Sequence, residues 1–185
     1  MKRGKVHLAM ERITKRLEQE GIPYAVIGGM ALVAHGFDRF TDDVDLLTTR
    51  EGLDRIHERL TGRGYVPPFA GSRKALRDTV NGVKVEFITT GEYPGDGLPK
   101  PVRFPDPADV SIEHEGYKVI SLPKLIELKL ASGLTNPLRI RDLADVQDLI
   151  VTLDLPREIG DQLDPSVRDE YYRRWQLFQA SKSSK

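Results

Sequence analysis

The chain lacks cysteine, long hydrophobic runs and an excess of either charge. Without cysteine it can form no disulfide, no thiolate metal site and no thiolate nucleophile. Its 28 basic residues balance 28 acidic ones, so net charge points to neither nucleic acid nor membrane, although a neutral total can hide a local basic patch. The apolar runs are too short to span a bilayer, and the basic N-terminus continues as an amphipathic helix rather than as a signal peptide. We therefore expect a cytoplasmic protein that does not enter membranes.

Three common site motifs are also missing. There is no Gly-x4-Gly-Lys-Ser/Thr, which excludes the usual P-loop interpretation of the glycines, and there is no Gly-x-Ser-x-Gly elbow. The histidines do not have the spacing of zinc ligands, so the sequence does not predict a zinc site. These are His7, His35, His57 and His114.

The composition is that of a folded domain, with 39% hydrophobic and 30% charged residues in 185. This length allows one core, or one core with a small appended subdomain. There is no internal repeat. We expect a core over residues 1–118, a C-terminal helical cap over 119–181 and a short tail at 182–185.

The spacing of apolar residues, together with glycine and proline residues that interrupt helices and strands, predicts alternating helices and strands in the first half of the chain. Gly21 and Pro23 end the first helix, and Gly28-Gly29 separates a short apolar strand from the helix that follows it directly. The expected elements are a helix over 4–19, a strand over Tyr24–Ile27, a helix after the glycines, a strand over Val44–Leu47 and a helix over Glu51–Leu60.

Two features lie between residues 74 and 109. The β-capable runs Ala75–Val80 and Val83–Ile88 flank Asn81-Gly82, a dipeptide that suits the type I′ turn of a hairpin. The following Pro/Gly-rich stretch, Gly91–Asp109, is long for a compact domain. It is therefore either a functional lid or a disordered excursion.

The last third is predicted to be helical. Leu122–Ser132 ends at Gly133, and Asn136 caps a helix that runs to about Leu153. Pro165 begins a final helix, whose aromatic residues are core or a dimer contact: Tyr171, Tyr172, Trp175 and Phe178. The order of elements favours an α/β fold, a mixed β-sheet flanked by helices with a C-terminal helical cap.

The most informative residues for chemistry are Asp43 and Asp45. Strand side chains alternate, so both carboxylates leave the same face of the strand, about 7 Å apart. Such a pair can bracket two divalent cations of the kind used in phosphoryl transfer. Gly28-Gly29, at a strand-to-helix turn, would let a phosphate approach the backbone closely.

Glu86 is the candidate third carboxylate. In the predicted strand Val83–Ile88, Val83, Val85 and Phe87 share one face, while Lys84, Glu86 and Ile88 share the other. If this strand pairs beside the Asp43/Asp45 strand, Glu86 faces the same cations and can accept the proton of an attacking hydroxyl. The alternative is that Glu86 simply faces solvent.

These residues resemble the signature of the DNA polymerase beta-like nucleotidyltransferase superfamily, in which a hydrophobic-Gly-Gly/Ser turn precedes Asp-hydrophobic-Asp. Here the signature stands as Ile27-Gly28-Gly29 and Asp43-Val44-Asp45. Many small bacterial members have Arg-x-Thr/Ser ahead of the first Asp, matched here by Arg39 and Thr41. The third carboxylate is commonly Asp, whereas this chain has Glu86.

The resemblance implies a nucleotidyltransferase-type fold and a reaction that needs Mg²⁺, with Mn²⁺ as a substitute, and an NTP such as ATP as substrate. It assigns Asp43, Asp45 and Glu86 to metal binding and catalysis. The nucleotide and its phosphates are assigned to Gly28, Gly29, Arg39 and Thr41. Arg39, like Lys84, can equally be an ordinary surface charge.

Two charges lie on predicted apolar helix faces. Lys129 falls within the apolar sector of the first C-terminal helix, and Asp142 within that of the next. A charge on a core face needs a partner, so the two are expected to meet. They form either a structural ion pair or part of a functional site.

A helical Lys followed by Arg-Asp-hydrophobic-x-Asp resembles the AbiEii/MenT-type nucleotidyltransferase toxins. The matching residues are Lys129 and the run Arg141–Asp145. This resemblance implies that Lys129 handles the triphosphate, with Asp142 or Asp145 nearby. It also implies a tRNA, other RNA or protein acceptor and an antitoxin partner.

Two alternatives stay open: a small-molecule adenylyltransferase of the aminoglycoside-resistance type, and an inactive nucleotide-binding, antitoxin-like partner. Retention of Asp43 and Asp45 argues against the inactive alternative. The sequence does not fix the acceptor, the preferred NTP or whether the chain forms a homo-oligomer.

Overall fold

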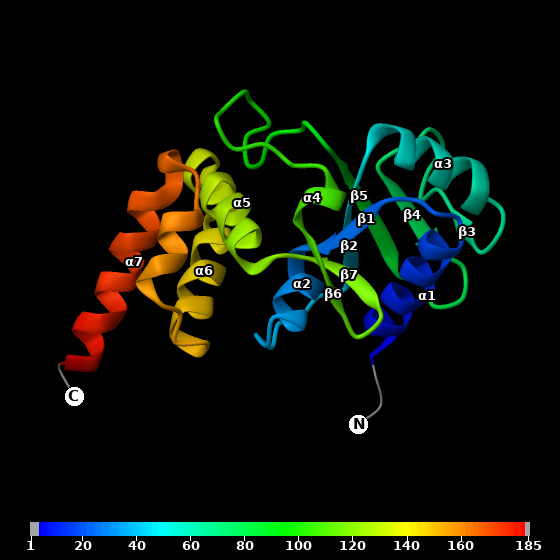
Figure 1. The fold of residues 1–185 in the computed structure, drawn as a ribbon. Helices are drawn as coiled ribbons and strands as arrows, with labels where there is room; N and C mark the ends of the chain where they lie inside the picture. The colour runs from blue at the N-terminus through cyan, green and yellow to red at the C-terminus, as the bar shows by residue number, and fades with distance from the viewer. Residues whose placement is uncertain (1–3, 184–185) are drawn as a thin grey trace. The chain divides into compact units, whose positions relative to one another are not determined.

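The computed structural model describes residues 4–183, which form two compact units (Figure 1). The sheet unit comprises Met1–Gly91 and Pro105–Ser121. The helical unit comprises Glu92–Phe104 and Leu122–Lys185. Each unit thus contains two stretches of the chain, because residues 92–104 are grouped with the C-terminal helices.

The sheet unit contains a seven-stranded sheet in the order β3-β4-β5-β2-β1-β7-β6. β2 pairs in parallel with β5 and antiparallel with β1, so the sheet is mixed and the predicted α/β class is confirmed. The strands are β1 (Tyr24–Ile27), β2 (Asp43–Thr48), β3 (Tyr65–Val66), β4 (Ala75–Asp78), β5 (Lys84–Thr89), β6 (Ser111–His114) and β7 (Tyr117–Ile120). The helices are α1 (Lys5–Gln19), α2 (Gly28–Ala34), α3 (Arg50–Leu60) and α4 (Pro107–Val110).

Alternation along the central strands gives the sheet two different faces. Val44 and Leu46 of β2 and Val85 and Phe87 of β5 are buried, and α1 contacts β2 while α3 contacts β5. Residues of α1 at helical spacing complete this core: Ala9, Met10, Ile13 and Leu17. The alternate positions of β2 and β5 carry the acidic residues, which stay partly exposed.

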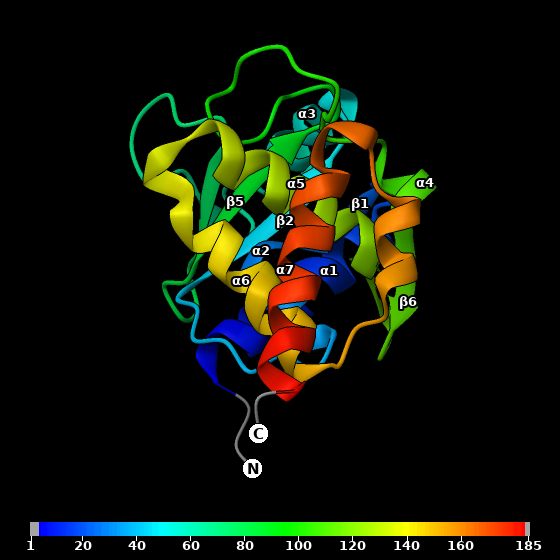
Figure 2. The same ribbon diagram turned by 90° about the vertical axis from the view of Figure 1, so that its left-hand side faces the viewer.

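The helices and strands predicted before residue 61 are all observed, with ends shifted by a residue or two. Figure 2 shows β2 and β5 side by side, as their parallel register requires. α2 begins on Gly28 itself rather than after the glycines. In α3, the Thr49 side chain accepts a hydrogen bond from the amide of Gly52, which caps the helix.

The β4–β5 hairpin is confirmed, but the prediction of a type I′ turn at Asn81-Gly82 is wrong. Gly82 has φ +73°, whereas Asn81 is not among the residues with positive φ that a type I′ turn needs. The Asp78 carboxylate accepts from the amide of Val80, and the amide of Gly82 donates to the carbonyl of Asp78. This side-chain turn makes the connection longer than two residues.

The β6–β7 hairpin was missed in the sequence. Its turn residues, Glu115 and Gly116, have φ of +47° and +87°, and His114 pairs with Tyr117. This is the type I′ geometry that was expected at Asn81-Gly82. The signal was an alternating run on each side of Gly116, which is weaker than an Asn-Gly dipeptide.

The helical unit contains three long helices that contact one another: α5 (Leu122–Thr135), α6 (Ile140–Thr152) and α7 (Pro165–Ser183). Short 3-10 turns precede α6 and α7, at Pro137–Arg139 and Arg157–Gln162. Asn136 accepts from the amide of Leu138, so it caps the 3-10 turn that precedes α6, whereas α6 itself begins at Ile140. Within residues 4–183 the structure holds no helix with the length and hydropathy to cross a membrane.

Gly133 does not end its helix, contrary to the prediction. It lies inside α5, where an added Cβ would be 2.4 Å from Cγ of Leu143 in α6. The glycine therefore permits close approach of the two helices and does not mark the end of α5. Of the aromatic residues of α7, Tyr171 is buried and its hydroxyl donates to the carbonyl of Pro156.

Residues 92–104 are held by hydrogen bonds within the helical unit. Of the two alternatives for the stretch Gly91–Asp109, the disordered excursion is therefore wrong, and the functional lid stays a prediction. The side-chain amide of Asn136 donates to the carbonyl of Gly95 at 3.1 Å. A Cβ on Gly95 would lie 2.3 Å from Oγ1 of Thr135, so this glycine sits directly against the end of α5. The amide of Phe104 donates to the carbonyl of Glu92 and closes the segment.

Candidate functional site

Three carboxylates meet on the partly open face of the sheet. Asp43 and Asp45 lie on β2, and Glu86 on β5 is the register partner of Asp45. One carboxylate oxygen from each lies within 4.8 Å of the other two, and all three residues are partly exposed. This is the pairing that the sequence analysis required for a third ligand. In the described part of the chain, no other acidic or histidine group has this arrangement.

Gly28 brings the backbone directly against this trio. Ile27, the residue before it, is the register partner of Asp45. Gly28 has φ +63°, and an added Cβ would lie 2.0 Å from Oδ2 of Asp45. Only glycine combines this left-handed conformation with the close approach. The carboxylate and the start of α2 are therefore in van der Waals contact.

Thr41 links the second glycine to the first aspartate. A Cβ on Gly29 would lie 2.9 Å from both Cβ and Oγ1 of Thr41. The Thr41 hydroxyl lies 3.1 Å from Oδ1 of Asp43 and 3.2 Å from its carbonyl oxygen, as a donor to either. The observed contacts of Thr41 thus orient a carboxylate. The resemblance to the nucleotidyltransferase superfamily predicts nucleotide binding for Thr41 instead.

Lys84 is inside the acidic cluster. It precedes Glu86 by two residues on the same face of β5, is the register partner of Asp43, and its ammonium is paired with the carboxylate of Glu86. That hydrogen bond, aided by the charges of Glu86, Asp43 and Asp45, raises the pKa of Lys84 above its ordinary value although burial acts in the opposite direction. The position of Lys84 in the sequence is also compatible with an ordinary surface charge, so its place in the cluster becomes evident only from the register of β5 with β2.

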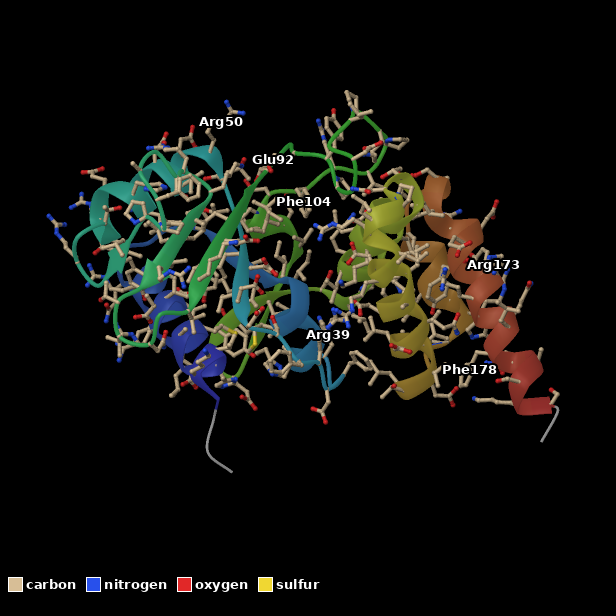
Figure 3. All side chains as sticks on the ribbon, turned by 180° about the vertical axis from the view of Figure 1, so that it is seen from behind. Arg39, Arg50, Glu92, Phe104, Arg173 and Phe178 are labelled. Carbon is tan, nitrogen blue, oxygen red and sulfur yellow. The ribbon has the colours of Figure 1, made fainter. Side chains whose placement is uncertain are left out.

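Arg39 lies on the loop between α2 and β2, two residues before Thr41 (Figure 3). It is partly buried, whereas the neighbouring Phe40 is 91% exposed. The loop therefore carries one of its large apolar side chains in solvent.

Lys129 and Asp142 meet in the helical unit, as their positions on apolar helix faces predicted. The Lys129 ammonium donates to Asp142 at 2.9 Å and to Asp145 at 2.8 Å. The Ser132 hydroxyl donates to the second oxygen of Asp142 at 2.6 Å. The Lys129 side chain is 11% exposed and that of Asp145 is 3% exposed, so α5 and α6 share a largely buried polar network. Ser132 was not predicted, although it lies one turn after Lys129.

The acidic trio has the chemistry of a divalent-cation site. Oxygen ligands from carboxylates suit Mg²⁺ and Mn²⁺, and partial exposure leaves room for water and phosphate oxygens to complete the coordination. The glycine contact also places main-chain atoms at the start of α2 directly beside the trio.

Comparison with solved structures identifies the fold. JHP933 from Helicobacter pylori is 17% identical, with 97% of this chain and 94% of that chain covered and a TM-score of 0.51. ANT(2'')-Ia in complex with adenylyl-2''-tobramycin is 11% identical, with 91% and 97% covered and a TM-score of 0.55. An antigenic nucleotidyltransferase-like protein from Paracoccidioides brasiliensis is 15% identical, with 79% and 75% covered and a TM-score of 0.50.

The chain has a nucleotidyltransferase fold. No protein-family model and no curated protein matches its sequence. At these identities the likeness concerns the fold alone. Within this nucleotidyltransferase fold, the chemistry has to be argued from the residues of the acidic trio and their neighbours.

Proposed function

We propose that the chain is a Mg²⁺-dependent nucleotidyltransferase that moves a nucleoside monophosphate from an NTP to an acceptor hydroxyl and releases pyrophosphate. One observation carries the proposal: Asp43, Asp45 and Glu86 converge within 4.8 Å, beside the Gly28 backbone, on a nucleotidyltransferase fold. Mn²⁺ is expected to substitute for Mg²⁺, since both accept carboxylate ligands.

In this reaction the acceptor oxygen forms a bond to the α-phosphorus, and the bond from that phosphorus to the β-phosphate bridging oxygen breaks. Divalent cations, when bound, neutralise charge on the phosphates and on both reacting oxygens. Asp43 and Asp45 would hold them from β2 and Glu86 from β5. Glu86 is also the residue proposed to take the proton of the acceptor hydroxyl. Cleavage of the bond from the α-phosphorus to the bridging oxygen releases pyrophosphate.

Four other residues have positioning roles in the proposal. Gly28 and Gly29 would hold the triphosphate at the start of α2, beside Asp45 and Thr41, and Arg39 would add a positive charge from the loop between α2 and β2. Thr41, whose hydroxyl contacts Asp43, would fix the orientation of that ligand while its neighbour Gly29 approaches the nucleotide. Outer contacts of this kind typically affect metal affinity or activity by about 10- to 100-fold.

Two classes of acceptor are compatible with the proposed reaction. The resemblance of Lys129 and Arg141–Asp145 to AbiEii/MenT-type toxins supports a tRNA, other RNA or protein acceptor, and with it an antitoxin partner. The likeness to ANT(2'')-Ia with adenylyl-2''-tobramycin supports an aminoglycoside-type acceptor instead. An inactive, antitoxin-like partner would not need three converging carboxylates.

Lys129 is proposed, on the same resemblance, to handle triphosphate, with Asp142 nearby. Its observed bonds to Asp142 and Asp145 supply a purely structural alternative. Lys129→Met separates the two. A structural role alone predicts a loss of about 3 kcal/mol in the free energy of unfolding with an unchanged KM for NTP, because two carboxylates lose their partner. A triphosphate role predicts a raised KM as well.

The proposed function is tested with each of the four α-labelled NTPs, Mg²⁺, and three acceptor pools: total cell RNA, total cell protein and a panel of aminoglycosides. We expect label transfer to one pool, and we expect Asp45→Asn to reduce it more than about 100-fold, beyond the effect of losing a group that merely orients a ligand. The matched control is Asp54→Asn, an exposed aspartate on α3 paired with Arg73.

Transfer by wild type and Asp54→Asn, but not by Asp45→Asn, supports the proposal. If protein that binds Mn²⁺ transfers label from none of the four nucleotides to any of the three pools, the proposed function is refuted.

A further inference from the structure

The acidic trio contains its own cation. Three carboxylates whose oxygens lie within 4.8 Å repel one another when all are ionised. The ammonium of Lys84 is paired with the carboxylate of Glu86, and Lys84 is the register partner of Asp43 on the neighbouring strand. Both partners of the contact are 40% exposed, so water and ions reach it.

The strand geometry explains why Lys84 occupies this position. Residues two apart on β5 share a face, so Lys84 and Glu86 project together. The parallel register with β2 then sets Lys84 opposite Asp43 and Glu86 opposite Asp45. A flexible four-carbon stem lets the ammonium reach Glu86 and also lets it move away, which a rigid guanidinium fork would do less readily.

We propose that Lys84 is an internal counter-ion that competes with a divalent cation for Glu86 and thereby lowers the metal affinity of the site. This inference rests on the proposed function only in taking the acidic trio as the metal site. Lys84 is a positioning residue here, because it acts on the metal through Glu86 and makes no contact with substrate in the proposal.

Two consequences follow from the competition. Metal binding must break the Lys84–Glu86 contact, so removal of the ammonium should tighten binding of the cation. Without metal, a variant that lacks the Lys84 ammonium has no charge to offset the three carboxylates, so it should be less stable than the metal-free wild type. A contact as exposed as this one contributes up to about 1 kcal/mol, which corresponds to an affinity change of about two- to fivefold.

The test is a Mn²⁺ titration of the full chain without nucleotide, followed by the electron paramagnetic resonance signal of free Mn²⁺. We expect Lys84→Met to bind Mn²⁺ about two- to fivefold more tightly than wild type at low ionic strength. The difference should shrink at 1 M salt, where the screening length is about 3 Å. Lys84→Arg keeps the charge and should bind Mn²⁺ no more tightly than wild type, because the guanidinium leaves Glu86 less readily.

The matched control is Lys118→Met. Lys118 is also a strand lysine of the sheet unit, 38% exposed and ion-paired with a carboxylate, Glu18, 3.3 Å away. Its removal should leave Mn²⁺ affinity unchanged, although it deletes the same side-chain charge from the protein as a whole. A general effect of net charge would instead shift both variants equally.

A second measurement detects the same competition through stability. Lys84→Met should melt at a lower temperature than wild type without metal, and saturating Mg²⁺ should raise its Tm by more than it raises that of wild type. Equal Mn²⁺ affinity in wild type and Lys84→Met, or weaker binding by the variant, overturns the inference. Because neither readout involves NTP, absence of label transfer would remove the proposed function while leaving this result intact.

Discussion

Gly28 is subject to two constraints that differ in origin. Its φ of +63° belongs to the left-handed region, which costs a residue with a Cβ roughly 1–2 kcal/mol. Separately, its missing side chain makes room for the Asp45 carboxylate, 2.0 Å from where a Cβ would stand. The first constraint affects the stability of the fold, and the second affects the proposed metal site.

Gly28→Ala should therefore lower stability by at least about 1–2 kcal/mol and also weaken Mn²⁺ binding, because Asp45 must move. The control is Gly82→Ala, which has φ +73° but nothing within 4 Å of the added Cβ. It should show the backbone cost without any change in Mn²⁺ affinity. Urea unfolding and Mn²⁺ titration measure the two effects. Equal loss of metal affinity in both variants would contradict the assignment.

His35 makes the stability of the sheet unit depend on pH. Its Nε2 lies 2.8 Å from the carbonyl oxygen of Ile120, to which the neutral ring can donate. Burial lowers the pKa of His35 below its ordinary 6.5, the Ile120 carbonyl partly offsets this, and the nearby His114 adds to it. As pH falls, the unfolded chain therefore takes up this proton before the folded one does.

The stability associated with neutral His35 should be complete above pH 6.5, the ordinary value, and decline as pH falls through the lower folded pKa. His35→Gln retains a donor but does not titrate. We expect the urea midpoint of wild type to drop more than that of His35→Gln between pH 8 and pH 5.5, since carboxylates titrate in both proteins. Parallel curves would show that this histidine does not contribute.

At the scale of elements, α5 and α6 illustrate how packing overrides a local signal. A glycine in a helix costs roughly 1 kcal/mol relative to alanine, and this is why Gly133 predicted a helix end. In the fold the residue faces Leu143, with its would-be Cβ 2.4 Å from Cγ and 2.7 Å from Cδ2. Close helix approach compensates for the unfavourable propensity.

Gly133→Ala should therefore destabilise the protein by about 1–3 kcal/mol through overpacking, instead of giving the gain expected at an exposed helical glycine. In a Leu143→Ala background the same change should be neutral or stabilising, because the clash with Leu143 is removed and only a 3.2 Å approach to the Arg139 carbonyl oxygen remains. Unfolding free energies of the two single variants and the double variant provide the cycle. A stabilised Gly133→Ala in the wild-type background would refute the packing explanation.

The two hairpins show which element predictions were reliable. Alternating runs located β4 and β5, and burial of Val85 and Phe87 follows that alternation. The predicted turn type was wrong because the Asp78 side chain accepts a hydrogen bond from the amide of Val80, and the connection is longer than two residues. A side chain that accepts a main-chain hydrogen bond can thus override the preference of an Asn-Gly dipeptide.

For the whole molecule, the division into two units determines which segments a bound ligand stabilises, and this division does not follow the order of elements in the sequence. Residues 92–104 bond to the C-terminal helices, although they lie between strands of the sheet unit in the sequence. The acidic trio belongs to one unit and the Lys129 network to the other. Ligands that bind the trio alone should therefore stabilise the units unequally.

Hydrogen exchange with and without Mg²⁺ should show this difference. We expect slower exchange of amides in β2 and β5 when Mg²⁺ is present, because a cation held by Asp43, Asp45 and Glu86 binds the folded sheet only. Amides of α5 and α6 should change less. An equal Mg²⁺-dependent gain in protection in both regions would contradict a site confined to the trio. Asp45→Asn provides the control, because this variant should lose the gain in protection that Mg²⁺ causes.

The sequence by itself determined what depends on period and local chemistry. Alternation along a strand placed Asp43 and Asp45 on one face, and helical spacing placed Lys129 and Asp142 on facing apolar surfaces. The tertiary structure alone decided which strands are neighbours. The parallel register of β2 with β5 brings Glu86 to Asp45 and Lys84 to Asp43. Local alternation decides only which face of its strand each residue occupies. The choice of neighbouring strand depends on hydrogen bonds between segments distant in sequence.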